Sequence, residues 1–139
     1  MSEDDRKKPE RKPAMELAQY RLEKAHDSLE DARTLFARGS YRGSNNRSYY
    51  AIFDALRALL ALEEVDYRKH SGVISHFQQH YIKTGLLDVE LSRIVTSASL
   101  IRSASDYEDF FVASKQEAQE QIDGAARLIA AVEDFLSSK

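Results

Sequence analysis

The sequence contains no cysteine and no tryptophan, and only two prolines and five glycines in 139 residues. Without cysteine the chain forms no disulfide and offers no thiolate to a metal, which fits a reducing compartment. With so few helix-breaking residues, long stretches are free to be helical, and no alternating apolar and polar run predicts a strand. No segment resembles a signal peptide or a bilayer-spanning run, so we expect a cytoplasmic protein without a membrane role.

The charge balance gives little sign of a nucleic-acid-binding protein, because the formal net charge is −3. The length suits one compact domain. Residues 1–13 are nearly all charged and include both prolines, so we expect a flexible charged arm there and a helical domain over residues 14–139. The arm is locally basic, and either a solvated tail or a weak phosphate contact fits it.

Apolar residues recur at helical spacing in five segments of the remaining chain. Two of the predicted helices carry matching stripes with alternating steps of three and four residues. Gly39 and Gly85 are placed to end helices, and residues 63–69 read as a loop. Two long helices joined through shorter ones predict an all-α antiparallel bundle of about five helices. The predicted helices cover approximately residues 14–37, 41–63, 71–84, 88–103 and 114–136.

The segment 46–60 is apolar almost all round and is predicted to be the central helix of the domain. A polar stripe nevertheless runs along it, with residues three or four apart. Charges inside a core cost free energy unless they are paired, so a second helix is expected to supply partners. Arg47 is predicted to pair with Asp54 or Asp106 in a partly buried network. The stripe consists of Arg47, Tyr50, Asp54 and Arg57.

Arg102 projects from the apolar face of the fourth predicted helix, and Asp106 and Tyr107 follow it at about one turn. One interpretation is a structural clamp, in which Arg102, Asp106 and Tyr107 fix helix ends. The other is a guanidinium that holds a phosphate beside a tyrosine hydroxyl. The residues themselves leave both interpretations open.

Three histidines raise the question of a metal site. His76 and His80 lie four residues apart, so two imidazoles on one helix face could share a zinc ion, with His70 or a carboxylate as a third ligand. The His-Glu-x-x-His pattern is absent, and solvated or capping histidines fit the sequence better. A glycine-rich phosphate loop and a nucleophile elbow are also missing. We therefore expect no metal and no cofactor.

Three motifs together resemble those of the HEPN family, the "higher eukaryotes and prokaryotes nucleotide-binding" helical domains, and most of all its small stand-alone prokaryotic branch. The order and spacing of the motifs match over residues 15–138, and the combination is more specific than any single motif. The motifs are Asn46-Arg47-Ser48-Tyr49-Tyr50-Ala51-Ile52-Phe53, Lys69-His70-Ser71-Gly72-Val73-Ile74 and Arg102-x-x-x-Asp106-Tyr107.

The resemblance implies an all-α bundle that forms a homodimer and often works beside a minimal nucleotidyltransferase in a toxin–antitoxin operon. Active members are metal-independent RNases, in which an Arg and a His four to six residues later meet their copies across the dimer cleft. Arg102 occupies the position of that Arg. No histidine follows His80, and Asp106 or Tyr107 stands where the family has its histidine.

We therefore expect a homodimer whose cleft binds RNA or a nucleotide beside a nucleotidyltransferase-type partner. The alternatives are an RNase toxin that uses Arg102, Asp106 and Tyr107, and a non-catalytic adaptor. The aromatic residues are too many for one small subunit to bury, so the dimer should cover part of the set Tyr49, Tyr50, Phe53, Phe110 and Phe111. The expected binding residues are Asn46, Arg47, Tyr50, Lys69 and His70.

Overall fold

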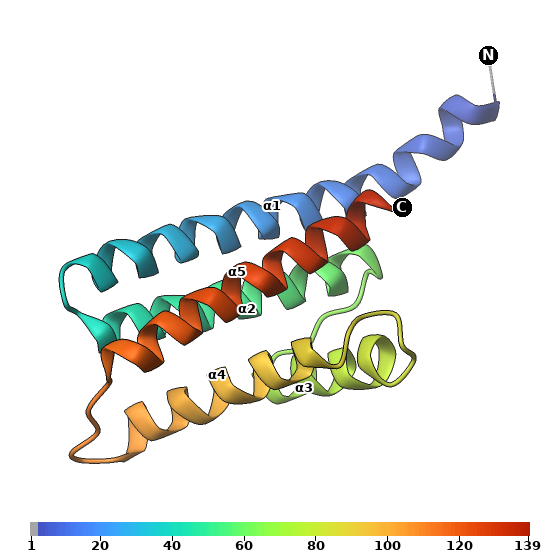
Figure 1. The fold of residues 1–139 in the computed structure, drawn as a ribbon. Helices are drawn as coiled ribbons and strands as arrows, with labels where there is room; N and C mark the ends of the chain where they lie inside the picture. The colour runs from blue at the N-terminus through green and yellow to red at the C-terminus, as the bar shows by residue number, and fades with distance from the viewer. Residues whose placement is uncertain (1–2) are drawn as a thin grey trace.

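The computed structural model describes the backbone of residues 3–139 and the side chains from residue 13 onward. Over this range the chain is an all-α bundle without strands, as predicted (Figure 1). None of the helices within it is long and apolar enough to cross a membrane. The α-helices are α1 (Glu3–Ala37), α2 (Tyr41–Leu62), α3 (His70–Phe77), α4 (Glu90–Tyr107) and α5 (Lys115–Ser137), and a short π-helix, η1 (Gln78–Ile82), continues α3.

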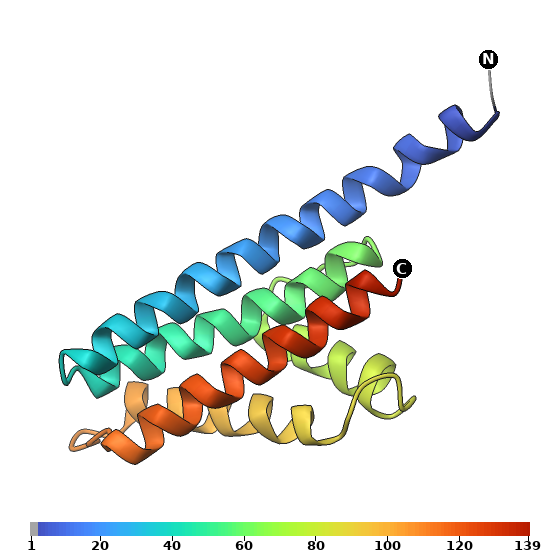
Figure 2. The ribbon, with the colours of Figure 1, turned by 45° about the horizontal axis from the view of Figure 1, so that its top comes forward.

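Helix α2 lies at the centre of the molecule. It runs antiparallel to α1, and α5 packs beside both of them (Figures 1 and 2). Helices α3 and α4 form a second layer on α2 and α5. This arrangement explains why α2 is apolar almost all round, because other helices cover it on several sides.

The interior of α2 combines small and large apolar residues. From Ala51 to Ala61 every residue is buried except Asp54 and Arg57. The alanines let neighbouring helices approach closely, while the larger side chains fill the space between them. At the start of α2, the buried Ser44 hydroxyl donates a 2.8 Å hydrogen bond to the Ala32 carbonyl, which ties α2 to α1.

The two long predicted stripes form the rest of the core. In α1 the stripe residues from Ala18 to Ala32 are buried, and in α5 those from Ala118 to Leu136 are buried. Helix α5 is capped by Ser114, whose hydroxyl accepts a 3.0 Å hydrogen bond from the Glu117 amide. The antiparallel bundle predicted from these stripes is confirmed.

Most of the predicted helix ends are close to the observed ones, and the start of α1 is the exception. Gly39 and Gly85 have φ angles of 81° and 76°, the left-handed conformation that ends a helix. Helix α4 begins at Glu90, two residues after Asp88, whose carboxylate accepts the Glu90 amide at 3.0 Å. Helix α1 begins at Glu3, well before the predicted start at residue 14. The flexibility of residues 1–13 stays a prediction, and residues 1–2 lie outside the described part.

The histidine pair of the weighed zinc site has structural partners. His76 is buried rather than solvated, and its Nε2 and Nδ1 lie 3.0 Å from the Glu63 carboxylate and the Tyr67 hydroxyl. The Tyr81 hydroxyl donates to the same carboxylate, and the His80 ring stacks on His76 at 4.2 Å. Residues 13–139 contain no group of three side chains suited to hold a metal ion. This network instead anchors the α2–α3 connection.

Candidate functional site

Arg102 on α4 is held by partners from two helices. Its Nε donates to the Asp106 carboxylate at 2.9 Å, and its Nη1 donates to Asn46 Oδ1 on α2 at 2.7 Å. The side chain is 29% exposed, so the guanidinium is fixed in position and still reaches solvent. The predicted neighbourhood of Arg102 and Asp106 is thus present, and Asn46 joins it.

Two tyrosines lie under this guanidinium. The Arg102 Cζ atom is 5.0 Å from the centroid of the Tyr49 ring and 5.3 Å from that of Tyr50. The Arg47 Cζ atom is also 5.3 Å from the Tyr50 ring. Both arginines are within the range of a cation–π interaction with Tyr50. We refer to Arg47, Tyr49, Tyr50 and Arg102 as the arginine–tyrosine cluster.

The predicted partner of Arg47 was wrong. Its Nη2 lies 3.1 Å from the Ser28 hydroxyl and 3.9 Å from the Asp31 carboxylate, both on α1. Helix α1 packs along this edge of α2 and brings Asp31 within reach, whereas Asp106 is engaged by Arg102. As predicted, a second helix supplies the partners, but the Asp31 side chain is 63% exposed.

Asp54, in the same stripe, lies among positive charges. Burial raises the pKa of Asp54, and four nearby cations oppose that rise without cancelling it. Arg21 bonds to the Arg57 carbonyl at 2.9 Å, which links α1 to this end of the stripe. Four basic side chains of α1 and α2 thus lie near Asp54, although the whole chain has a net charge of −3. The four cations are Lys24, Arg57, Arg47 and Arg21.

A cavity of about 430 Å³ opens beside Arg102, between the start of α2 and the end of α4. On its other side the Arg42 guanidinium donates to the hydroxyl and the carbonyl of Ser105 at 3.0 and 2.7 Å. A comparable cavity of about 450 Å³ lies between α4 and α5, where three carboxylates outnumber the guanidiniums of Arg93 and Arg127 and make it less suited to an anion. The carboxylates are those of Glu90, Glu117 and Glu120. The cavity beside Arg102 is the better place for a phosphate.

The structure does not bring all the expected residues together. The Tyr107 side chain is 83% exposed and makes no described contact with Arg102, so Tyr50 takes the place expected for Tyr107. Lys69 is exposed and only precedes α3. Tyr49 and Phe53 are buried within the single subunit, so Tyr50, Phe110 and Phe111 are the members of the aromatic set that a dimer could still cover. Phe110 is 94% exposed, so a dimer interface over this residue stays a prediction.

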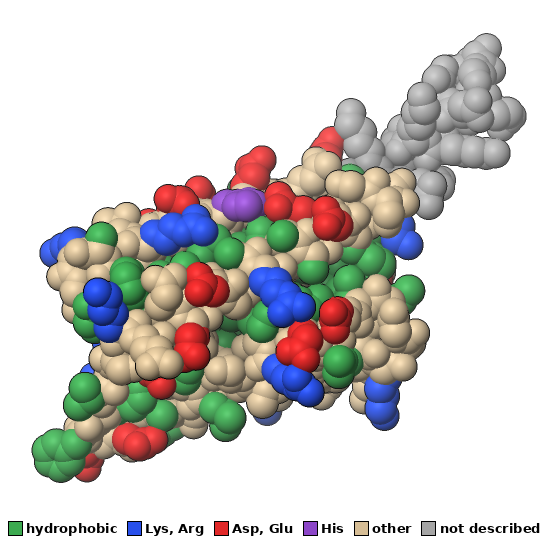
Figure 3. Space-filling view, in the orientation of Figure 1, with side chains coloured by type: hydrophobic (Ala, Val, Ile, Leu, Met, Phe, Trp, Pro, Cys, Tyr) green, Lys and Arg blue, Asp and Glu red, His purple; other side chains and the backbone are tan. Residues whose placement is uncertain are grey.

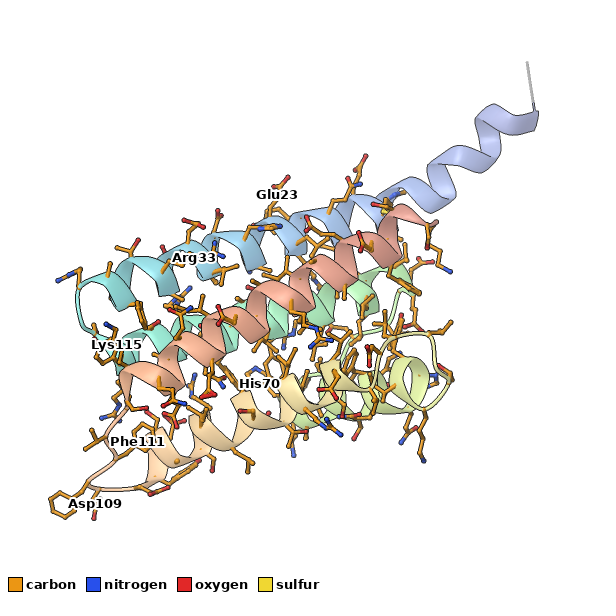
Figure 4. All side chains as sticks on the ribbon, in the orientation of Figure 1. Glu23, Arg33, His70, Asp109, Phe111 and Lys115 are labelled. Atoms are coloured by element: carbon orange, nitrogen blue, oxygen red, sulfur yellow. The ribbon has the colours of Figure 1, made fainter. Side chains whose placement is uncertain are left out.

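His70, the first residue of α3, reaches the cluster through Tyr49. Its Nδ1 lies 2.7 Å from the Tyr49 hydroxyl, and its ring stacks on Phe53 at 4.2 Å. Figure 4 shows His70 between α2 and α4. Sequence reasoning placed Tyr49 among the aromatic residues of the central helix that a dimer is expected to cover in part, and no spacing rule connects it to His70. The only available signal was that both residues belong to family motifs.

Comparison with known proteins agrees with this architecture. The HEPN domain profile matches residues 18–135. A protein named as a toxin candidate in Methanocaldococcus jannaschii is 38% identical over 98 residues, which are 70% of this chain and 67% of that protein. A UPF0332 protein of Gloeobacter violaceus is 35% identical over 84% of this chain and 93% of its own length. This chain belongs to the HEPN domain family.

Proposed function

We propose that this HEPN protein is a toxin-type component of a system with a nucleotidyltransferase partner, and that it binds RNA at the arginine–tyrosine cluster. The names of its relatives support the toxin-type role, since two proteins of Methanocaldococcus jannaschii that it resembles are named as toxin candidates. The nucleotidyltransferase partner is proposed from the setting that the family resemblance implies. The geometry of the cluster supports the RNA binding.

The observation that carries the proposal is Tyr50, whose ring has two guanidiniums within cation–π distance. Arg47 and Arg102 each lie 5.3 Å from its ring, and Arg102 borders an open cavity. Guanidiniums bind phosphates through paired hydrogen bonds, and aromatic rings stack on unpaired bases. Positive and aromatic groups in alternation suit a single strand of RNA better than a lone phosphate.

A two-fold dimer would double this surface. The connection between α4 and α5 exposes Phe110 and Val112 by 94% and 82%, and apolar side chains protrude at this end of the molecule in Figure 3. An isologous interface that covers them would place one arginine–tyrosine cluster in each subunit of a symmetric cleft. Light scattering at tens of micromolar should give a dimer, and a monomer would contradict this part.

The test of RNA binding uses fluorescence anisotropy with a labelled single-stranded RNA of mixed sequence, in EDTA and over a series of salt concentrations. Arg102→Ala should weaken binding at least tenfold and make it less salt-dependent, by about 0.7 in the log–log slope for each phosphate that the variant no longer binds. Arg93→Ala is the matched control, because Arg93 is on the same helix, is 73% exposed and lies away from the cluster.

Equal affinities of Arg102→Ala and the wild type would refute the RNA-binding proposal and favour the adaptor. The RNase alternative through Asp106 and Tyr107 has less support. Asp106 forms an ion pair with Arg102 at 2.9 Å, and Tyr107 points to solvent away from it. Robust cleavage that disappears in Asp106→Ala or Tyr107→Phe would revive that alternative.

A further inference from the structure

Arg57, the last residue of the polar stripe on α2, is a half-buried cation that forms no ion pair among the described side chains. Its Nε atom is buried and also lacks a hydrogen-bond partner there. Arg47 on the same stripe has Asp31 as a carboxylate partner at 3.9 Å. Arg102 has Asp106 at 2.9 Å. A cation withdrawn from water costs free energy unless an anion compensates it, so Arg57 is suited to an anion from outside the chain.

Two cations of α1 lie at this end of the stripe. Lys24 and Arg21 both oppose the rise in the pKa of the half-buried Asp54, and Arg57 does the same from α2. Arg21 also donates to the Arg57 carbonyl at 2.9 Å and pairs with Asp66 at 3.7 Å, with 61% of the Asp66 side chain exposed. Three cations thus share two carboxyl groups, of which one is half-buried and the other is largely screened by water. Positive charge is therefore in excess at this place.

This end of the stripe is a neighbour of the arginine–tyrosine cluster. Arg57 follows Tyr50 by seven residues, as 57 minus 50, so the two lie on one face of α2, two turns and about 10 Å apart along its axis. Arg57 and Arg102 both lower the pKa of His70. Both also oppose the rise in the pKa of Tyr49, so the two guanidiniums lie within electrostatic reach of the same rings. One phosphate cannot bridge this length, whereas successive phosphates of one strand can.

We propose that Arg57 and Lys24 form a second phosphate subsite, and that an RNA strand bound at Arg102 continues along α2 to reach it. The inference rests on the proposed function, since it requires that Arg102 and Tyr50 hold one part of the strand. In the free protein Asp54 offsets part of the positive charge of the subsite, and in the complex a backbone phosphate does so. A single nucleotide therefore fills only the site at Arg102, whereas a longer strand fills both.

The chemistry of this surface favours an RNA strand over an acidic peptide. Arg57 has a planar guanidinium, which binds phosphate oxygens through parallel N–H groups. Lys24 is exposed, so its flexible ammonium group can reach the same phosphate. The Tyr50 ring, two turns back on α2, can stack on a base, and a peptide has no base to offer. Because the subsite binds only the backbone of the strand, it should not select a sequence.

The experiment compares a long and a short RNA on the full-length protein in EDTA. The long probe is a labelled oligouridylate of about ten nucleotides, followed by anisotropy over a salt series, and the short probe is a diuridine with a single phosphate, measured by competition. Arg57→Gln should bind the long probe roughly tenfold more weakly, with a log–log salt slope lower by about 0.7, and bind the diuridine as the wild type does. Arg102→Ala should weaken binding of both. Arg33→Gln is the matched control, because Arg33 is on α1, is 48% exposed and pairs with Glu30.

Two further variants separate the charge of the subsite from its packing. Arg57→Lys keeps the charge and should keep the salt slope of the long probe, although it loses the paired N–H groups. Asp54→Asn removes a carboxylate beside the subsite, so it should bind the long probe more tightly than the wild type and the diuridine equally well. A role of Arg57 in packing alone does not predict this gain. Asp54→Asn also tests the subsite if Arg57→Gln fails to fold.

The outcomes separate this inference from the proposed function. An unchanged salt slope in Arg57→Gln, or an equal loss of affinity for the two probes, would overturn the second subsite. Loss of binding in Arg102→Ala together with wild-type binding in Arg57→Gln would leave the proposed function standing without it. Polyglutamate that displaces the long probe and not the diuridine would assign the surface at Arg57 to an acidic peptide and overturn the inference. Wild-type protein that binds neither probe would remove both.

Discussion

The interior of α2 and the polar stripe on the same helix have opposite character. Ile52, Leu56 and Leu59 have no exposed surface, whereas Arg47 and Tyr50 on the same helix are half-buried beside charged partners. The interior residues gain free energy from leaving water, and the contacts of the stripe residues hold charges in place. One helix thus serves the stability of the bundle at some positions and the candidate RNA site at others. Substitutions should separate these two contributions.

The largest expected effect is on stability, from Leu56→Ala in the interior of α2. Leu56 is fully buried, so its truncation leaves a cavity and should cost about 2–5 kcal/mol of unfolding free energy. Urea denaturation followed by circular dichroism measures this loss. RNA affinity of the folded fraction should stay at the wild-type level, and a loss below about 1 kcal/mol would show that the interior repacks easily.

Tyr50→Ala in the stripe should lower RNA affinity and leave the stability of the fold near the wild-type level. The ring between Arg47 and Arg102 is removed, and RNA binding should weaken by about 1–3 kcal/mol if a base stacks there. Anisotropy titrations beside Tyr20→Ala provide the comparison, since Tyr20 is 57% exposed on α1. Equal losses in the two variants would mean that Tyr50 has no special part in binding.

Arg47→Ala tests whether the polar stripe contributes to stability, because the stripe was predicted to contain a buried ion pair. Its partner is instead Asp31, at 3.9 Å with 63% of that side chain exposed, and such pairs contribute about 0–1 kcal/mol. We therefore expect a small change in melting temperature, similar to that of Arg33→Ala, which breaks another exposed pair on α1. A loss of about 3 kcal/mol in unfolding free energy would instead support the predicted buried network.

The smallest effect is expected from Asp54→Asn, and it depends on pH. Because burial raises the pKa of Asp54 in the folded protein, its protonated form favours folding. That contribution is complete below the unfolded pKa of about 4 and is lost as the pH rises through the folded value. The variant should thus gain stability relative to wild type between about pH 4 and pH 7 in urea titrations. A relative loss over this range would mean that the four surrounding cations outweigh burial.

Much of the fold was predictable because its signals are local. The stripes of α1 and α5, the ends at Gly39 and Gly85 and the Ser114 start of α5 all follow from residue spacing and capping within single helices. The family was also recognisable, since its motifs lie in three short segments. The start of α1 was not predictable in this way, because residues 3–12 contain no stripe to mark it.

The composition of the candidate site was decided between helices. The sequence by itself determined the helices, the polar stripe on α2 and the position of Arg102 on its helix face, because helical geometry fixes neighbours three and four residues apart. It contained no rule that selects Asp31 rather than Asp54 for Arg47, or that joins His70 to Arg102 through Tyr49. These contacts depend on the rotation and spacing of packed helices, which the whole core sets at once. Only the tertiary structure could therefore connect His70 to Arg102 through Tyr49.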